Sequence, residues 1–143
     1  MTLVSPSWDR WTYAAELVSV YDGDTIRVRC DVGFDIHLTL SLRLLGIQTP
    51  EIGGAGITPE ERRAGLEARE ALLTLIGDHP LIVRTKKDAR EGRGRYLATL
   101  YAVQHNGLWL DLCADLIDAG HAVAYDGKGR APRWTPEGWR PAA

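Results

Sequence analysis

Five charged residues in three short segments have the types and spacing that cleavage of a phosphodiester bond requires. Asp22 and Asp24 are separated by one glycine, Arg43 precedes Glu51 by eight positions, and Arg95 directly follows a glycine. Carboxylate oxygens suit a hard cation such as calcium or magnesium. A further carboxylate can activate water, and guanidinium groups make two-point contacts to phosphate oxygens. The set therefore predicts metal-assisted hydrolysis of a phosphodiester.

Each segment is ordinary when it is taken alone. Asp-Gly-Asp is a common turn sequence, and an arginine is common on the exposed side of a strand. The second segment is more informative, because Thr49-Pro50 restrains the backbone directly before Glu51. The backbone carbonyls of that step are also potential calcium ligands. The prediction thus depends on the three segments meeting in space.

Residues 14–20, 25–30 and 36–44 have the apolar patterns of three successive strands. Arg43 belongs to the third strand, and its side chain is expected on the face opposite the aliphatic residues. That strand has an aliphatic residue at every second position, which is the period of a half-buried strand: Ile36, Leu38, Leu40, Leu42 and Leu44.

A helix is expected after a glycine-rich loop. Thr58 is expected to be its N-cap and Pro59 its first residue, with Glu61 completing a capping box. Apolar residues then recur at helical spacing until Gly77, which is expected to end the helix. We expect this helix to be structural rather than catalytic. Strands over 81–84 and 96–103 and a helix over 111–119 are expected to follow.

The element order predicts an α+β domain that is mainly β. Its centre is a five-stranded OB-fold barrel, with the capped helix between strands three and four and a second helix after strand five. A small sandwich is the alternative, and the mid-chain helix disfavours it. We expect an N-terminal extension over residues 1–13, the barrel domain over 14–125, and an irregular tail over 126–143, where glycine and proline are frequent.

Three ordered strings of this sequence resemble the staphylococcal-nuclease-like (thermonuclease) family: Val20–Thr25, Leu42–Glu51 and Gly94–Ala98. Gly120–Tyr125 is a weaker fourth match. The resemblance covers roughly residues 14–125, so the barrel domain is expected to be staphylococcal-nuclease-like. It implies an OB-fold endonuclease that hydrolyses DNA and RNA, with Ca²⁺ as cofactor. We expect the DNA or RNA partner to be single-stranded.

The resemblance also implies a metal site. By position, Asp24 resembles a direct calcium ligand, Asp22 a neighbour that acts through water, and the Thr49 carbonyl a further ligand. Gln48 stands where the best-known members have a metal-binding aspartate. An amide oxygen can bind calcium but brings no charge, so a lower calcium affinity is expected.

The catalytic and substrate-binding roles are implied in the same way. Glu51 resembles the general base, and Arg43 and Arg95 resemble the pair that binds the phosphate and stabilises its developing charge. Tyr125 and Arg93 resemble contacts to the nucleotide. The tail after Tyr125 departs from the family, which has a further helix there.

The overall charge does not predict nucleic-acid binding, but its distribution does. The net charge is −2, whereas residues 84–95 contain six Lys or Arg and only two acids. This local excess attracts a polyanion, and Lys87 is expected to contact substrate. A solvated basic loop is the alternative. A non-catalytic OB-fold module that binds single strands, or a protein-interaction domain on the same barrel, also remains open.

The sequence gives no indication of a membrane protein. No apolar run is long enough to span a bilayer, and the first residues lack the basic start and apolar stretch of a secretory signal. We therefore expect no membrane association and a cytoplasmic location, or export if a signal has been removed. Separately, we expect a monomer.

Overall fold

The computed structural model describes residues 1–90 and 94–141, without the side chains of residues 87–90. Arg93 lies outside the described residues. For Lys87 the structure describes the backbone alone.

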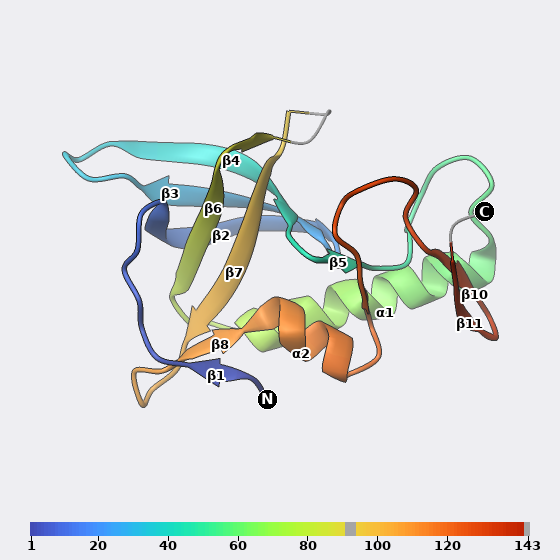
Figure 1. The fold of residues 1–143 in the computed structure, drawn as a ribbon. Helices are drawn as coiled ribbons and strands as arrows, with labels where there is room; N and C mark the ends of the chain where they lie inside the picture. Colours follow the sequence, from blue (N-terminus) through green and yellow to red (C-terminus); the bar gives the residue numbers. More distant parts are fainter. Residues whose placement is uncertain (91–93, 142–143) are drawn as a thin grey trace.

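Five strands close into a barrel around the main hydrophobic core (Figure 1). Neighbouring strands pair antiparallel, except β4 and β7, whose parallel pairing closes the barrel. The fold is thus the predicted α+β class with an OB-fold-like barrel. In order around the barrel the strands are β4 (His37–Leu44), β3 (Thr25–Asp31), β2 (Thr12–Asp22), β6 (Leu81–Arg90) and β7 (Tyr96–Val103).

Helix α1 (Pro59–Ile76) packs against the barrel (Figure 1). In the sequence it lies between the short strand β5 (Ile47–Gln48) and β6. Its predicted ends are confirmed: Thr58 is the N-cap, Pro59 begins the helix, and Gly77 is the C-cap. The helix buries one apolar stripe against the barrel, as the helical period requires: Ala68, Leu72 and Ile76.

Short elements extend the barrel sheet at its edge. Strand β8 (Trp109–Asp111) pairs with β7 and leads into α2 (Leu112–Asp118), whose N-cap is Asp111. Strand β1 (Leu3–Val4) pairs with β8, and Thr12 and Tyr13 already belong to β2. Within residues 1–13, predicted as an extension, Leu3–Val4 and the first two residues of β2 therefore belong to the sheet. Strand β9 (Val123–Ala124) pairs with β5.

The C-terminal tail is not wholly irregular, which corrects the sequence prediction. Strands β10 (Arg133–Thr135) and β11 (Gly138–Arg140) form an antiparallel hairpin. Pro136 has the fixed φ that suits a turn, and Gly138 has a φ of 120°, a conformation that L side chains rarely adopt. The hairpin lies beside the N-terminal end of α1 (Figure 1).

The predicted half-buried strand over 36–44 is buried only in its second half. Leu42 and Leu44 are in the core, whereas Ile36 and Leu38 are exposed and Phe34, at the hairpin tip, is 96% exposed. The β3–β4 hairpin extends beyond the barrel (Figure 1), so its outer aliphatic residues have no partner layer. The period-2 pattern predicted the strand correctly and its burial only in part.

Candidate active site

The β2–β3 turn places two carboxylates below the barrel surface. Asp22 and Asp24 are each 4% exposed. Gly23 between them packs tightly, because a Cβ at this position would lie 2.7 Å from Thr49 Cγ2 and 3.0 Å from Ala68 Cβ. Only glycine therefore lets the turn approach both the Thr49 segment and α1. This approach brings the first and second sequence segments together.

Asp24 is the centre of a hydrogen-bond network. Its Oδ2 accepts from the Thr49 backbone N–H at 3.0 Å and pairs with Arg43 Nη2 at 3.3 Å. Its Oδ1 accepts from the Thr25 hydroxyl at 3.2 Å. The Asp24 backbone N–H in turn donates to Asp22 Oδ1 at 3.1 Å. The turn itself thus holds Asp22, whereas Asp24 is also held by Thr49 and Arg43 from other segments.

The two predicted arginines converge on this network from neighbouring strands. Arg43, opposite Thr25 in the β3–β4 register, donates to the Leu44 and Ile47 carbonyls at 2.9 and 3.0 Å. Arg95, just before β7, donates to the Thr25 hydroxyl at 2.7 Å. The parallel pairing of β4 with β7 is what brings Arg95 close to Arg43.

Gln48 links Arg43 to Glu51. Its Oε1 accepts from Arg43 Nη2 at 3.0 Å, and its Nε2 donates to the Thr49 carbonyl at 3.0 Å and to Glu51 Oε1 at 3.1 Å. The amide is 7% exposed. Gln48 therefore holds the Glu51 carboxylate toward Arg43, a positioning role that an aspartate, which has no N–H, does not provide.

Helix α1 contacts the backbone at Glu51 and so helps to position this residue; that the helix is structural rather than catalytic stays a prediction. The Thr58 hydroxyl accepts from the Glu61 N–H, but the Glu61 carboxylate accepts at 3.0 Å from the Glu51 backbone N–H. The capping box is therefore only half formed. At Gly65 a Cβ would lie 2.9 Å from both the Pro50 and the Glu51 carbonyl oxygens. Neither contact is visible in the sequence pattern.

Negative charge dominates the cluster. Burial, followed by the adjacent Asp24 carboxylate, raises the pKa of Asp22 far above its usual range. Burial and the charge of Asp24 also raise the pKa of Glu51, while the hydrogen bond from Gln48 and the charge of Arg43 oppose this rise. Ionised carboxylates at this site are thus costly unless a positive charge joins them.

The donor set suits a hard cation in its chemistry. Three carboxylates and the Thr49 carbonyl are oxygen ligands of the kind calcium prefers, and Thr49 Oγ1 is buried without a hydrogen-bond partner within the described part of the chain. In this conformation, however, Arg43 and the Gln48 amide occupy several of these oxygens. Among residues 1–90 and 94–141, no three acidic, His or Cys side chains surround one metal position. A cation would have to displace Arg43 and Gln48.

A cavity of about 510 Å³ opens beside the network and has two walls from distant parts of the chain. Gln48, Thr49 and Glu51 line one side. The opposite side comes from the C-terminal hairpin, including Trp134 and Trp139. Sequence reasoning missed both tryptophans as site residues. No local pattern marked them, because each lies in a strand of only three residues.

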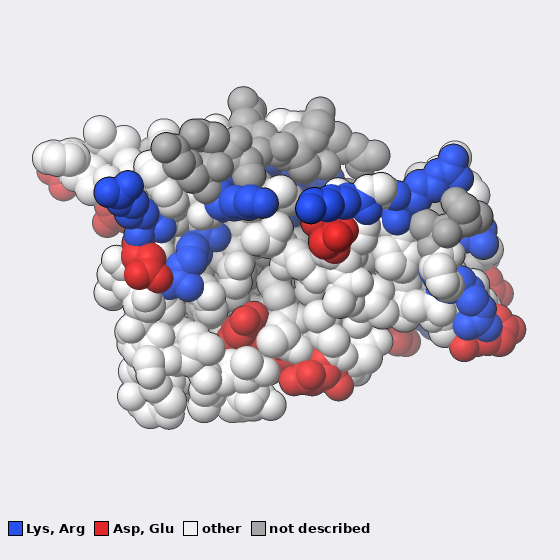
Figure 2. Space-filling model, in the orientation of Figure 1, with Lys and Arg blue, Asp and Glu red and all other residues white. Residues whose placement is uncertain are grey.

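Other predicted substrate contacts have different positions. Tyr125 donates its hydroxyl to the Gly129 carbonyl at 2.6 Å and does not line the cavity. Arg84, part of the basic stretch, is bound within the protein: it contacts Thr12, the Ser7 carbonyl and the Tyr101 hydroxyl. Lys86 is exposed. Figure 2 shows Lys and Arg in a band across the upper part of one face.

Comparison of the sequence with protein-family models and with curated proteins found no match. Within the described residues, no helix is both long enough and apolar enough to cross a membrane.

Proposed function

We propose that this protein is a metal-dependent phosphodiesterase, a thermonuclease-like endonuclease that cleaves single-stranded DNA or RNA. One observation carries the proposal: a continuous set of contacts joins all three sequence segments. Arg95 binds Thr25, Thr25 binds Asp24, Asp24 pairs with Arg43, and Gln48 joins Arg43 to Glu51. A structural role alone does not require a half-buried carboxylate that a buried amide links to a guanidinium group.

The residues divide the chemistry between them. Glu51, oriented by Gln48 and Glu61, would accept the proton of the attacking water, a contribution of roughly 10²–10⁴-fold. Burial and the charge of Asp24 raise the pKa of Glu51 in the metal-free site, and a cation bound beside it would oppose that rise. Arg43 and Arg95 would contact the phosphate oxygens, where charge develops in the transition state.

Asp22, Asp24 and the Thr49 carbonyl would hold calcium. Bound calcium would polarise a phosphoryl oxygen and offset its charge. Asp24 Oδ2 is 3.3 Å from Arg43 Nη2, so Asp24 would hold calcium only if it gave up this ion pair. Release of Arg43 from this pair would leave its guanidinium available for the phosphate. The ion pair between Asp24 and Arg43 would then be the arrangement of the site without calcium.

A non-catalytic module that binds single strands is the second candidate. The Arg43–Asp24 pair favours it, because a guanidinium neutralised within the fold contributes less to phosphate chemistry. Such a module would use the OB-fold face and exposed cations, without need of Glu51.

Incubation of the purified protein with an end-labelled single-stranded oligonucleotide separates the two candidates. We expect cleavage in calcium, none in excess chelator, and recovery when calcium is restored. Binding is measured in the same samples at low salt. Binding without cleavage under every divalent cation tested would support the binding module, and absence of both would exclude nucleic acid as the partner.

A further inference from the structure

The C-terminal hairpin forms a second wall of the site and has aromatic side chains on the side facing it. In the β10–β11 register Trp134 lies opposite Trp139, so both indoles share one face of the hairpin. Both line the cavity of about 510 Å³ that Glu51 also lines. Both are half-buried. Two large flat side chains thus stand across a cavity from the candidate general base.

The neighbouring register pair of the hairpin is cationic, and its Arg133 also lines the cavity. Arg133 lies opposite Arg140 in the register, and both side chains are exposed. Within residues 1–90 and 94–141, no ion pair joins either arginine to a carboxylate. Like charges directly opposite each other destabilise a hairpin, and a polyanion close by would relieve the repulsion. The hairpin therefore combines stacking surfaces with charges suited to a phosphate backbone.

The hairpin is a small separate sheet. A two-stranded hairpin alone is marginally stable in water, and β10 and β11 pair only with each other among the described strands. Its residues nevertheless line the cavity together with residues of the barrel and of the start of α1. The cavity volume falls within the roughly 300–1,000 Å³ of small-molecule sites, which accommodates one nucleoside.

We propose that this cavity binds one nucleobase of a single-stranded nucleic acid, stacked on Trp134 or Trp139, next to the phosphate at Arg43 and Arg95. The inference rests on the proposed function for its choice of ligand. Aromatic stacking tolerates every base, because each base has a π-face. Thr58 and Glu61 also line the cavity, and the Thr58 hydroxyl and the second Glu61 carboxylate oxygen offer polar groups to the base edge. The tail thereby supplies the substrate-positioning surface of the site.

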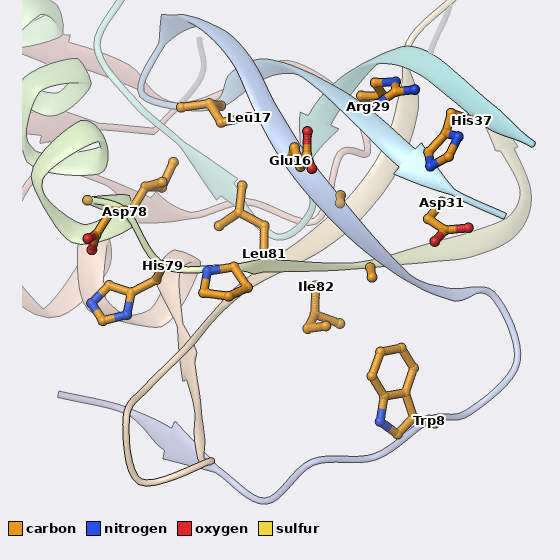
Figure 3. A pocket seen from close by; sticks show the side chains of 15 residues that line it. Trp8, Glu16, Leu17, Arg29, Asp31, His37, Asp78, His79, Leu81 and Ile82 are labelled. Atoms are coloured by element: carbon orange, nitrogen blue, oxygen red, sulfur yellow. The ribbon is translucent and has the colours of Figure 1, made fainter. Parts of the chain in front are cut away.

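The test measures binding in chelator, where no cleavage occurs, so its result does not depend on catalysis. The probes are fluorescein-labelled oligothymidylate and an abasic strand of the same length. Trp134→Ala and Trp139→Ala are compared with the aromatic replacements Trp134→Phe and Trp139→Phe. Trp8→Ala is the matched control, because Trp8 is 63% exposed and lines a separate cavity at the other end of α1 (Figure 3).

We expect at least one alanine variant to bind oligothymidylate roughly 5- to 150-fold more weakly, the range for loss of one stacked base. Its affinity for the abasic strand should not change, the phenylalanine variants should bind nearly as wild type, and Trp8→Ala should have no effect. Equal losses for both strands, or unchanged binding in every variant, would overturn the inference. Tighter binding in an alanine variant would show that the hairpin obstructs the site.

The two proposals can fail separately. Base-dependent binding that requires the tryptophans, in a protein that never cleaves, would retain this site on a binding module and reject the nuclease. Cleavage in calcium combined with tryptophan-independent binding would retain the nuclease and reject the base site.

Discussion

Two cavities lie at opposite ends of α1, a helix of 18 residues that is about 27 Å long. The cavity at the Gly77 end is larger, about 610 Å³, and the cavity at the Thr58 end is about 510 Å³. The larger one has acids, an arginine and two histidines around it (Figure 3). Size and residue type alone would select it, yet its polar groups do not act together.

The two sites differ in how their polar groups are held. Glu16, Arg29 and Asp31 at the larger cavity are exposed, and His79 Nδ1 is engaged with the Val103 carbonyl at 2.9 Å. Leu81 and Ile82 lie between the charged groups in Figure 3. In the network beside the smaller cavity, by contrast, Asp24 and Gln48 are buried, and Arg43 Nη2 contacts both of them. Buried polar groups in contact, which are costly to maintain, distinguish the candidate site.

The largest difference in activity is expected between loss of Asp24 at the candidate site and loss of Asp31 at the larger cavity. Asp24→Asn should reduce cleavage to the level of wild type in chelator, because the variant lacks the central carboxylate for calcium. Calcium should also no longer raise its melting temperature. Asp31→Asn should retain activity and the calcium-induced shift. Thermal unfolding with and without calcium checks both, and a full calcium shift in Asp24→Asn would move the metal elsewhere.

Arginine replacements should have the next largest effect. Arg43→Lys and Arg95→Lys should each reduce turnover by roughly 10²-fold, because lysine keeps the charge but cannot make a two-point contact to phosphate. Arg29→Lys, at the larger cavity, should leave the rate unchanged. Steady-state kinetics on a single-stranded substrate provide the comparison. Wild-type rates in both lysine variants would reduce these arginines to general electrostatic roles.

A methyl group added to α1 at position 65 should lower turnover by displacing Glu51. Gly65→Ala places a Cβ against the Pro50 and Glu51 carbonyls and should lower turnover about tenfold, since displacement of a catalytic group by a fraction of an ångström is costly. Leu66→Ala, at an exposed position of the same helix, is the control. If Gly65→Ala retains full activity with an unchanged melting temperature, α1 does not position the base.

The smallest change in activity is expected when Gln48 is replaced. Gln48→Asp should lower the calcium concentration for half-maximal activity by a few-fold, because calcium affinity increases with the number of charged ligands. The variant should be less stable without calcium, since it loses the hydrogen bonds that the Gln48 amide donates to Thr49 and Glu51. Gln104→Asp is a remote control. Unchanged or weaker calcium binding by calorimetry would remove residue 48 from the metal site.

Local signals in the sequence were sufficient for part of the account. Thr58 and Gly77 set the ends of α1 because caps act within one turn of a helix. Alternating residues predicted β3 and β4, and the barrel order followed from the succession of elements. That Arg43, Asp24 and Glu51 would meet was a prediction from the family resemblance and the segment spacing, and the contacts agree with it.

Contacts between distant residues were not predictable in the same way. Glu61 bonds to Glu51 instead of closing its capping box, because the Pro50–Glu51 segment packs directly on α1 at Gly65. The tail has the glycine and proline content of an irregular segment. Its hairpin forms where Trp134 and Trp139 can dock on the barrel domain, and no local pattern encodes that surface.

The rate of a single turnover tests most directly whether the Thr58 end of α1 contains the catalytic base. Wild type, Glu51→Gln and Glu16→Gln are mixed in excess with an end-labelled single strand and calcium, and cleavage is followed in time. We predict that Glu51→Gln lowers the rate by roughly 10²-fold or more with unchanged folding, while Glu16→Gln cleaves as wild type. Equal rates for Glu51→Gln and wild type would contradict the account.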